Sequence, residues 1–382
     1  MTDDSKRPLV TFFVIAYNQA RFVREAVEGA LAQTYSPMEI LLSDDCSSDG
    51  TFEIIQEVVK GHTGPHKLIL NRNNCNLGLS EHLNRIMELA TGELIVASDG
   101  DDVSNPHRTE RCVEVWLRNG KPAALASSFS CIDAAGNPSK TKNGDQWFAR
   151  CIPDENESPS ARLLRFAQQG SPRLNSCSAA WTKELSDAFG SLPAGLWFED
   201  DVMTFRALLF DRIIFIQEAL VRYREHGSNL YNRVAVPLTT LQARRHAEQA
   251  AKIHAQRRKE ALLSYLPDLD LALRQQWITP LLCEELKRRI GTGCVFYHII
   301  EDWWNVDWIN RLASFFFIVR SGRVAEARWA GPRLLPFPLF LALGAICSRV
   351  RMISLGAWNV FAVAFGVVLQ ADMGQVSTHW AC

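Results

Sequence analysis

Three carboxylates follow one short apolar run near residue 100. The run from Leu94 to Ala97 predicts a buried strand, and Asp99, Asp101 and Asp102 come where it ends. Burying several like charges together costs free energy unless a positive charge lies among them. Mg2+ and Mn2+ prefer oxygen ligands, and they commonly bind one or two carboxylates together with the phosphates of a substrate. The pattern therefore suggests a site at which a divalent metal ion holds a diphosphate.

An acidic turn by itself needs no metal, because Asp and Gly are common turn residues. The neighbouring elements decide between the two interpretations. Short apolar runs rich in β-branched residues alternate here with segments whose apolar residues repeat at helical spacing. This order predicts an α/β fold with a mainly parallel sheet flanked by helices. The predicted strands are Leu9 to Ala16, Glu39 to Ser43, Lys67 to Asn71 and Leu94 to Ser98.

Polar residues follow three of these strands. Tyr17-Asn18 follows the first, Asp44-Asp45 the second, and the acidic turn the fourth. Ligands of parallel sheets bind beyond the carboxyl ends of the strands, so these ends favour one binding crevice over unconnected surface turns. The sequence lacks the glycine-rich motifs that cradle dinucleotides and nucleoside triphosphates. We therefore expect a diphosphate held through Mg2+ or Mn2+.

The composition bounds the class of protein. The chain has 382 residues, 47% of them hydrophobic and 22% charged, which is typical of a globular protein. Its formal net charge of -1 argues against nucleic acid as a partner. Its ten cysteines include no C-x-x-C pair, which favours reduced cytosolic thiols over a zinc site or a disulfide framework. The polar start leads us to expect no signal peptide.

Four motifs in the first hundred residues have the order and approximate spacing of one known family. The segment resembles the nucleotide-sugar-binding half of the family 2 glycosyltransferases, which have the GT-A fold. One difference is Cys46, where the family usually has Gly in a loop near the nucleotide. The matching segments are Val14 to Asn18, Ile40 to Thr51, Asn76 to Gly78 with Asn84, and Gly92 to Asp102.

The resemblance implies roles for the residues at the strand ends. Tyr17 would lie near the nucleobase, and Asp44 or Asp45 would hydrogen-bond the base or the ribose. Asp99 and Asp101 match the family's Asp-x-Asp motif. Asp101 would ligate Mg2+ or Mn2+, and Asp99 would face the ribose or a metal-bound water. The predicted nucleotide-sugar-binding set is Tyr17, Asn18, Asp44, Asp45, Asp99 and Arg224, and the predicted metal set is Asp101, Asp99 and His226.

A second acidic motif, Glu199-Asp200, begins a later helical pattern. Acidic residues are favoured in the first turn of a helix by its dipole, so a purely structural role is one interpretation. With Arg206, however, the motif resembles the family's Glu-Asp motif, which opens a helix that carries an Arg. The resemblance implies that Asp200 is the catalytic base and Glu199 its orienting partner, with Asp201 as the alternative base.

The segment from Tyr223 to His226 resembles the Tyr-Arg-x-His segment that closes many of these catalytic domains. Arg224 would then bind the diphosphate, because a guanidinium matches phosphate geometry. His226 would contact the diphosphate or the metal, although a single histidine commonly has no special role.

The C-terminal third differs in composition from the rest. We expect a catalytic domain at residues 1–235, a helical region at 236–330 and a hydrophobic, membrane-associated tail at 331–382. Residues 352–371 carry no charge, and their length of 20 residues suffices to span a bilayer. A hydrophobic helix packed within a soluble domain would show the same pattern. We expect a cytoplasmic protein associated with the inner membrane.

These observations predict an inverting, metal-dependent glycosyltransferase. It would move a sugar from a nucleoside diphosphate sugar of the UDP, GDP or dTDP type to a hydroxyl of a glycan or lipid-linked acceptor, in cell-surface polysaccharide synthesis. One alternative is a nucleotidyltransferase, but its glycine-rich basic loop is missing from the sequence. The other is a non-catalytic membrane scaffold derived from a transferase. Asp99, Asp101 and Asp200 argue against a scaffold, because it has no need of them.

Overall fold

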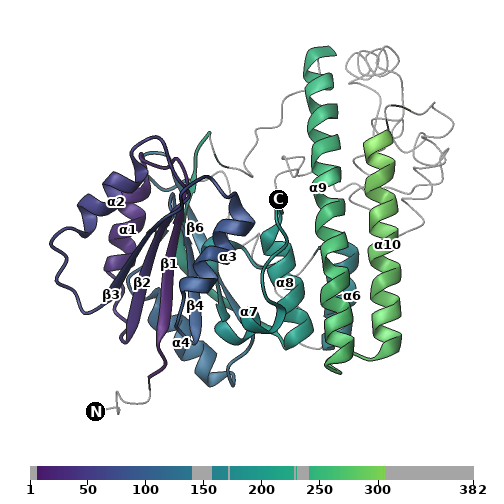
Figure 1. Ribbon diagram of the computed structural model, residues 1–382, viewed down its shortest axis with the longest axis horizontal. Helices are drawn as coiled ribbons and strands as arrows, with labels where there is room; N and C mark the ends of the chain where they lie inside the picture. The colour runs from purple at the N-terminus through teal and green to yellow at the C-terminus, as the bar shows by residue number, and fades with distance from the viewer. Residues whose placement is uncertain are drawn as a thin grey trace, which may run out of the picture. The chain divides into compact units, whose positions relative to one another are not determined.

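The chain is organised around an eight-stranded sheet flanked by helices (Figure 1). The computed structural model describes residues 7–139, 157–170, 173–227, 229, 241–303 and 305. The strands lie in the order β3-β2-β1-β4-β7-β6-β8-β5. They are β1 (Val10–Ala16), β2 (Met38–Asp44), β3 (Lys67–Arg72), β4 (Leu94–Asp99), β5 (Val103–Ser104), β6 (Ala124–Asp133), β7 (Ala179–Thr182) and β8 (Ile213–Glu225).

The first four strands are parallel, as predicted. β1 lies between β2 and β4, and β3 pairs with the outer side of β2. Nearly every residue of β1, β2 and β4 is buried, which explains why these strands are continuous apolar runs rather than alternating ones. The three polar strand ends meet at one edge, because Ala16 pairs with Asp44 and Ile15 pairs with Asp99.

The second half of the sheet is mixed in direction. β7 is antiparallel to both β4 and β6, whereas β8 runs parallel to β6. The short strand β5 pairs with β8, so that Val103 lies opposite Arg222. This pairing brings the end of β8 beside the acidic turn that connects β4 to β5. The sequence motif after Tyr223 is therefore positioned by the sheet itself.

Helices connect the strands in the order expected of an α/β fold. α1 and α2 pack against each other, and α3 contacts β1 and β2. In the second half a single 3-10 turn, η2, precedes β7, and α8 begins with the second acidic motif. The helices and the turn are α1 (Val23–Leu31), α2 (Thr51–Val59), α3 (Leu79–Leu89), α4 (Arg108–Arg118), α6 (Pro159–Gln169), η2 (Ser176–Ser178), α7 (Lys183–Phe189), α8 (Glu199–Phe210), α9 (Leu241–Arg274) and α10 (Pro280–Asp302).

Two compact units divide the chain. The first comprises residues 1–226 together with 257–295, and the second comprises residues 227–256 and 296–382. The second half of α9 and most of α10 thus belong to the unit that holds the sheet. The predicted divisions at residues 235 and 330 stay predictions.

The predicted membrane tail at residues 331–382 lies outside the described residues. Among the helices of the described ranges, none is both long enough and apolar enough to cross a bilayer.

Candidate active site

The acidic turn after β4 lies directly against the end of β1. The amide of Gly100 donates to the carbonyl of Ile15 at 2.9 Å. A Cβ at position 100 would lie 2.3 Å from Oε1 of Gln19 and 3.0 Å from Cβ of Ala16. Glycine is therefore the residue that lets this turn approach β1, and the approach fixes the direction of the carboxylates on either side.

Asp101 and His226 meet at this turn. Nε2 of the His226 ring lies 2.9 Å from Oδ2 of Asp101, and both side chains are largely buried. The ring of Phe22 packs against the imidazole with its centroid 4.5 Å away. The structure thus brings together two of the three predicted metal ligands from distant parts of the chain.

Arg224 lies beneath the turn and supports it. Its Nε donates to the carbonyl of Asp101 at 2.9 Å, and its Nη2 lies 3.0 Å from Oε2 of Glu25. Its backbone amide donates to Oδ1 of Asp102 at 2.7 Å. The side chain is 1% exposed, so its observed contacts hold the turn in place. Its predicted contact with a diphosphate stays a prediction.

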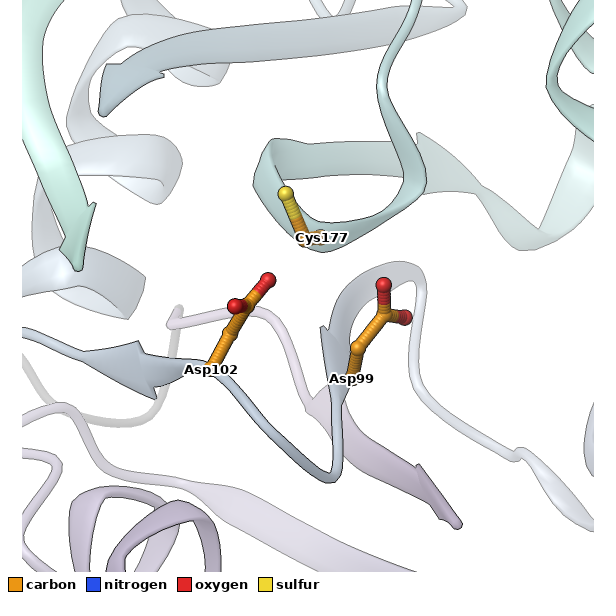
Figure 2. Close-up of side chains that lie close together, drawn as sticks. All are labelled: Asp99, Asp102 and Cys177. Atoms are coloured by element: carbon orange, nitrogen blue, oxygen red, sulfur yellow. The ribbon is translucent and has the colours of Figure 1, made fainter. Parts of the chain in front are cut away.

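Asp99, Asp102 and Cys177 form a cluster beside this turn. Figure 2 shows the thiol of Cys177, carried by η2, opposite the two carboxylates. One ligand atom from each of the three residues lies within 4.8 Å of the others. Asp102 and Cys177 are fully buried, and Asp99 is partly exposed.

The acidic groups in and around this cluster shift one another's pKa values. Burial, with the negative charges of Asp101 and Asp200, raises the pKa of Asp99 to about 8, and the nearby Arg108 opposes this shift. Burial, with the negative charges of Asp101 and Asp99, also raises the pKa of Asp102. Arg108 is fully buried and donates through Nη1 to Oγ of Ser104 at 2.8 Å. Burial and mutual repulsion therefore both oppose ionisation of these carboxylates, and the charge of Arg108 opposes the shift at Asp99.

Glu199 and Asp200, in the first turn of α8, are held by Ser176 of η2. Oγ of Ser176 donates to Oε1 of Glu199 at 3.0 Å and also to Oδ1 of Asp200. The Ser176 amide donates to the same Asp200 oxygen at 3.2 Å. Burial raises the pKa of Asp200, and the hydrogen bond from Ser176 lowers it. The η2 turn joins the two predicted acidic motifs, because Ser176 bonds Glu199 and Asp200 while the adjacent Cys177 lies beside Asp99 and Asp102.

Asp201 has different surroundings from its two neighbours. Its Oδ1 lies 2.7 Å from Nε of Arg173, and its Oδ2 pairs with Nη1 of Arg258. The side chain is 4% exposed. A carboxylate occupied by two guanidinium groups is poorly placed to accept a proton from a substrate, so the geometry favours Asp200 over Asp201 as a base.

The two aspartates that end β2 also differ. Asp45 accepts hydrogen bonds from Nδ2 of Asn73 at 2.8 Å and from the amides of Leu77 at 2.9 Å and Gly78 at 3.0 Å. Asp45 therefore holds the Asn76–Gly78 turn. Asp44 accepts from the Ser47 amide at 2.9 Å through Oδ2, while its buried Oδ1 has no hydrogen-bond partner among the described residues. Asp44 is the one with an oxygen left for a ligand.

Tyr17 and Asn18 lie at the end of β1. Tyr17 is 46% exposed, as expected for a side chain that receives a ligand. The side-chain Oδ1 of Asn18 accepts a hydrogen bond from the Ser48 amide at 3.0 Å. The backbone amide of Asn18 donates to Oγ of Ser47 at 2.8 Å. Cys46 has a left-handed backbone with φ of 62°. The loop thus keeps the conformation that favours glycine, at a cost of about 1–2 kcal/mol.

Comparison with known proteins identifies this part of the chain. Residues 11–184 match the model of glycosyl transferase family 2. Over this range the chain is similar to the family 2 glycosyltransferases. The matched range contains β1 to β4, the acidic turn after β4 and η2, whereas Glu199 and Asp200 lie beyond its end.

Two relatives and one solved structure extend the comparison. The chain is 39% identical over 34% of its length to EpsE of Bacillus subtilis (strain 168), named as a glycosyltransferase, and 31% identical over 37% of its length to a chondroitin synthase of Escherichia coli. It matches 46% and 20% of the length of these two proteins, which is less than half of each. The mannosyltransferase PcManGT of Pyrobaculum calidifontis, solved with GDP-Man and Mn2+, shares the fold with a TM-score of 0.51 at 18% identity. That match covers 95% of this chain and 86% of the other, and it confirms the predicted GT-A fold class.

The donor atoms at the acidic turn after β4 fit a divalent cation. Asp99 and Asp101 offer carboxylate oxygens, and His226 offers an imidazole nitrogen beside Asp101. Oxygen ligands with one imidazole suit Mg2+ and Mn2+. Burial and acidic neighbours raise the pKa values of Asp99 and Asp102, and a bound cation would favour their ionised forms.

Several residues of the site were not predicted. Ser176 and Cys177 join the two acidic motifs, yet they lie in a segment without a recognisable motif. Arg108 and Arg258 supply the nearby positive charges from α4 and α9. No spacing in the sequence connects any of these residues to Asp99 or Asp200. Their roles follow from the sheet order and the helix packing alone.

Proposed function

We propose that this protein is an inverting, metal-dependent glycosyltransferase that moves a sugar from a nucleoside diphosphate sugar to an acceptor hydroxyl. The observation that carries the proposal is the closeness of the two acidic motifs. Asp99 ends β4 and Asp101 follows it, Glu199 and Asp200 begin α8, and residues of the η2 turn lie against both motifs. One motif serves the leaving group and the other serves the incoming nucleophile.

The first motif binds the donor diphosphate. Asp101 and His226, with Asp99, would hold Mg2+ or Mn2+, and their observed closeness supports this assignment. When bound, such a cation neutralises the negative charge that grows on a departing diphosphate. The Mn2+ and GDP-Man in PcManGT support the same choice of metal and donor class. Arg224 keeps the turn in place through the Asp101 carbonyl.

The nucleoside lies against the ends of β1 and β2. The exposed ring of Tyr17 offers a stacking surface for a base. The unpartnered Oδ1 of Asp44 accepts a hydrogen bond from the base or the ribose. Asp45 holds the adjoining turn through the Gly78 amide, and Asn18 holds the loop of Ser47 and Ser48 through the Ser48 amide.

Asp200 acts as the general base. It removes the proton of the acceptor hydroxyl while the hydroxyl oxygen forms a bond to the anomeric carbon. The bond from that carbon to the diphosphate oxygen breaks on the opposite face, so the configuration inverts in one displacement. Glu199 shares the Ser176 hydroxyl with Asp200 and orients the base.

The setting of the reaction is cell-surface polysaccharide or lipid-linked glycan synthesis at the cytoplasmic face of the inner membrane. The named chondroitin synthase among the relatives supports polysaccharide as the acceptor class. Fractionation of the full chain and of a chain cut near residue 330 tests the membrane part. Equal solubility of the two would contradict it.

The test of the activity uses the full-length protein with Mn2+ and a panel of UDP-, GDP- and dTDP-sugars. Release of nucleoside diphosphate from at least one donor is expected. Asp101→Ala should abolish metal-dependent donor binding, whereas Asp200→Asn should keep donor binding and lose transfer. If no donor binds or reacts, the proposed function is wrong. If both variants lose donor binding equally, the division of roles is wrong.

A further inference from the structure

The second half of α9 packs directly on α8, the helix that begins with Glu199 and Asp200. Tyr265 stacks on Phe205 with the ring centroids 4.3 Å apart. Asp268 forms a buried ion pair with Arg206, in which Nε and Oδ2 are 2.9 Å apart. Both charged side chains are at most 6% exposed. These contacts lie within the first compact unit, so α8 is held by a helix from beyond the matched family domain.

A third contact from α9 reaches the acidic motif itself. Nη1 of Arg258 pairs with Oδ2 of Asp201, and the Arg258 side chain is 12% exposed. The same guanidinium lies over the ring of Phe198, 3.9 Å from its centroid. Phe198 and Asp201 are the residues immediately before and after Glu199-Asp200. One arginine therefore contacts both neighbours of the proposed catalytic motif.

The charges around this helix start explain why a cation is needed there. Glu199, Asp200 and Asp201 are three consecutive acidic residues in the first turn of α8. The helix dipole favours acidic residues at this position, but only by about 0.3–1 kcal/mol each at the surface. The facing groups from other elements are Arg173 and Ser176 before β7, Asp99 of β4 and Arg258 of α9. Both facing arginines pair with Asp201, and Arg258 also lies over the ring of Phe198.

We propose that Arg258 is a positioning residue for the catalytic base, which it holds in place by neutralising Asp201 and packing on Phe198. This inference rests on the proposed function and assigns a role to a residue outside the matched domain. Without the Arg258 charge, Asp201 keeps only Arg173 as a partner. Its repulsion of Asp200 then displaces the start of α8. Donor binding, which uses the ends of β1, β2 and β4, is left unchanged.

The experiment compares Arg258→Met with Arg258→Lys in the full-length protein, using Mn2+ and a donor that the wild type turns over. Arg258→Met keeps the apolar stem and should lower kcat by on the order of a hundred-fold, since small displacements of a catalytic group cost about that much. KM and Kd for the donor should stay near the wild-type values. Arg258→Lys restores the charge without the planar stack and should have an intermediate kcat. Lys287→Met is the matched control, because it removes a cation of α10 that pairs with Asp270 of α9, the helix that carries Arg258. It should leave kcat unchanged.

A double variant separates positioning from folding. In Arg258→Met with Asp201→Asn the unneutralised charge is gone, so kcat should recover most of the loss. If the double variant does not recover kcat, the inference is wrong. It is also wrong if Arg258→Met has the wild-type kcat, or if Arg258→Met loses donor affinity and kcat equally. If Arg258→Met does not fold, Arg258→Lys and the double variant still decide the outcome. If the wild type turns over no donor, the proposed function fails and the inference fails with it.

Discussion

Nε2 of His226 lies 2.9 Å from Oδ2 of Asp101, although the two residues are 125 positions apart in the sequence. The pairing of β8 with β5 and β6 produces this contact, because it carries the end of β8 to the turn after β4. Phe22 of the loop before α1 closes over the imidazole. Three separate segments thus fix one nitrogen beside one carboxylate, which is the preorganisation that a metal site needs.

Replacing His226 with Ala should therefore raise the Mn2+ concentration needed for donor binding. We expect an increase of about 10–100-fold, the range found when groups that hold or orient a metal are removed. Thermal shift in the presence of donor, titrated with Mn2+, measures this directly. His107→Ala is the control, since His107 is exposed and pairs with Glu218 away from the turn. Overlapping Mn2+ titration curves for the His226 variant and the wild type would exclude His226 as a ligand.

The first half of the fold was predictable because local sequence determines it. Continuous apolar runs identified β1 to β4, since strands buried on both faces have no polar positions. The strand ends then located Asp44, Asp99 and Asp101 without any knowledge of contacts. Predicting the rest required knowing which distant segments pair.

Ser176 shows why the remaining site residues could not be predicted. Its hydroxyl bonds Asp200, 24 residues later, because β7 inserts antiparallel between β4 and β6 and places η2 beside α8. Arg258 reaches Asp201 from a helix 57 residues on. The choice between Asp44 and Asp45 also depended on distant partners, because Asp45 binds the turn before α3. Such contacts leave no periodic signal in a single sequence.

Replacing Ser176 with Ala should shift the pH dependence of transfer. The Ser176 hydrogen bond lowers the pKa of Asp200 against the effect of burial, so its loss raises that pKa. Because the base must be ionised, the acid limb of kcat/KM should move to higher pH. Ser178→Ala, in the same turn, removes a hydroxyl that bonds Asn175 instead, and should leave the profile in place. An unshifted profile for the Ser176 variant would show that this bond does not tune the base.

Replacing Asp99 with Asn should stabilise the metal-free protein at neutral and alkaline pH. Burial raises the pKa of Asp99 to about 8 in the folded state, against about 4 in an unfolded chain. Between these values the folded state binds more protons, so the free energy of unfolding falls as the pH rises. The Asn variant carries no ionisable group at this position, so its free energy of unfolding does not fall with pH in this way. Its advantage in urea unfolding with EDTA should be near zero at pH 4 and reach a few kcal/mol at pH 8. Asp211→Asn, at an exposed acid that pairs with Arg212, is the control and should show no such trend. A pH-independent difference for the Asp99 variant would contradict the role of its charge.

Replacing Asp268 with Ala should destabilise the protein far more than the same change two residues later. Asp268 pairs with Arg206 at 2.9 Å with both side chains buried, and its loss removes the carboxylate that neutralises the Arg206 charge. Breaking a buried pair in this way costs about 3–5 kcal/mol. Asp270 pairs with Lys287 at 2.7 Å but is 51% exposed, so Asp270→Ala should cost about 0–1 kcal/mol. Urea unfolding of the two variants measures the difference. Equal losses would show that the Asp268–Arg206 pair does not anchor α8, since Asp270 pairs with Lys287 of α10 and does not contact α8 through that pair.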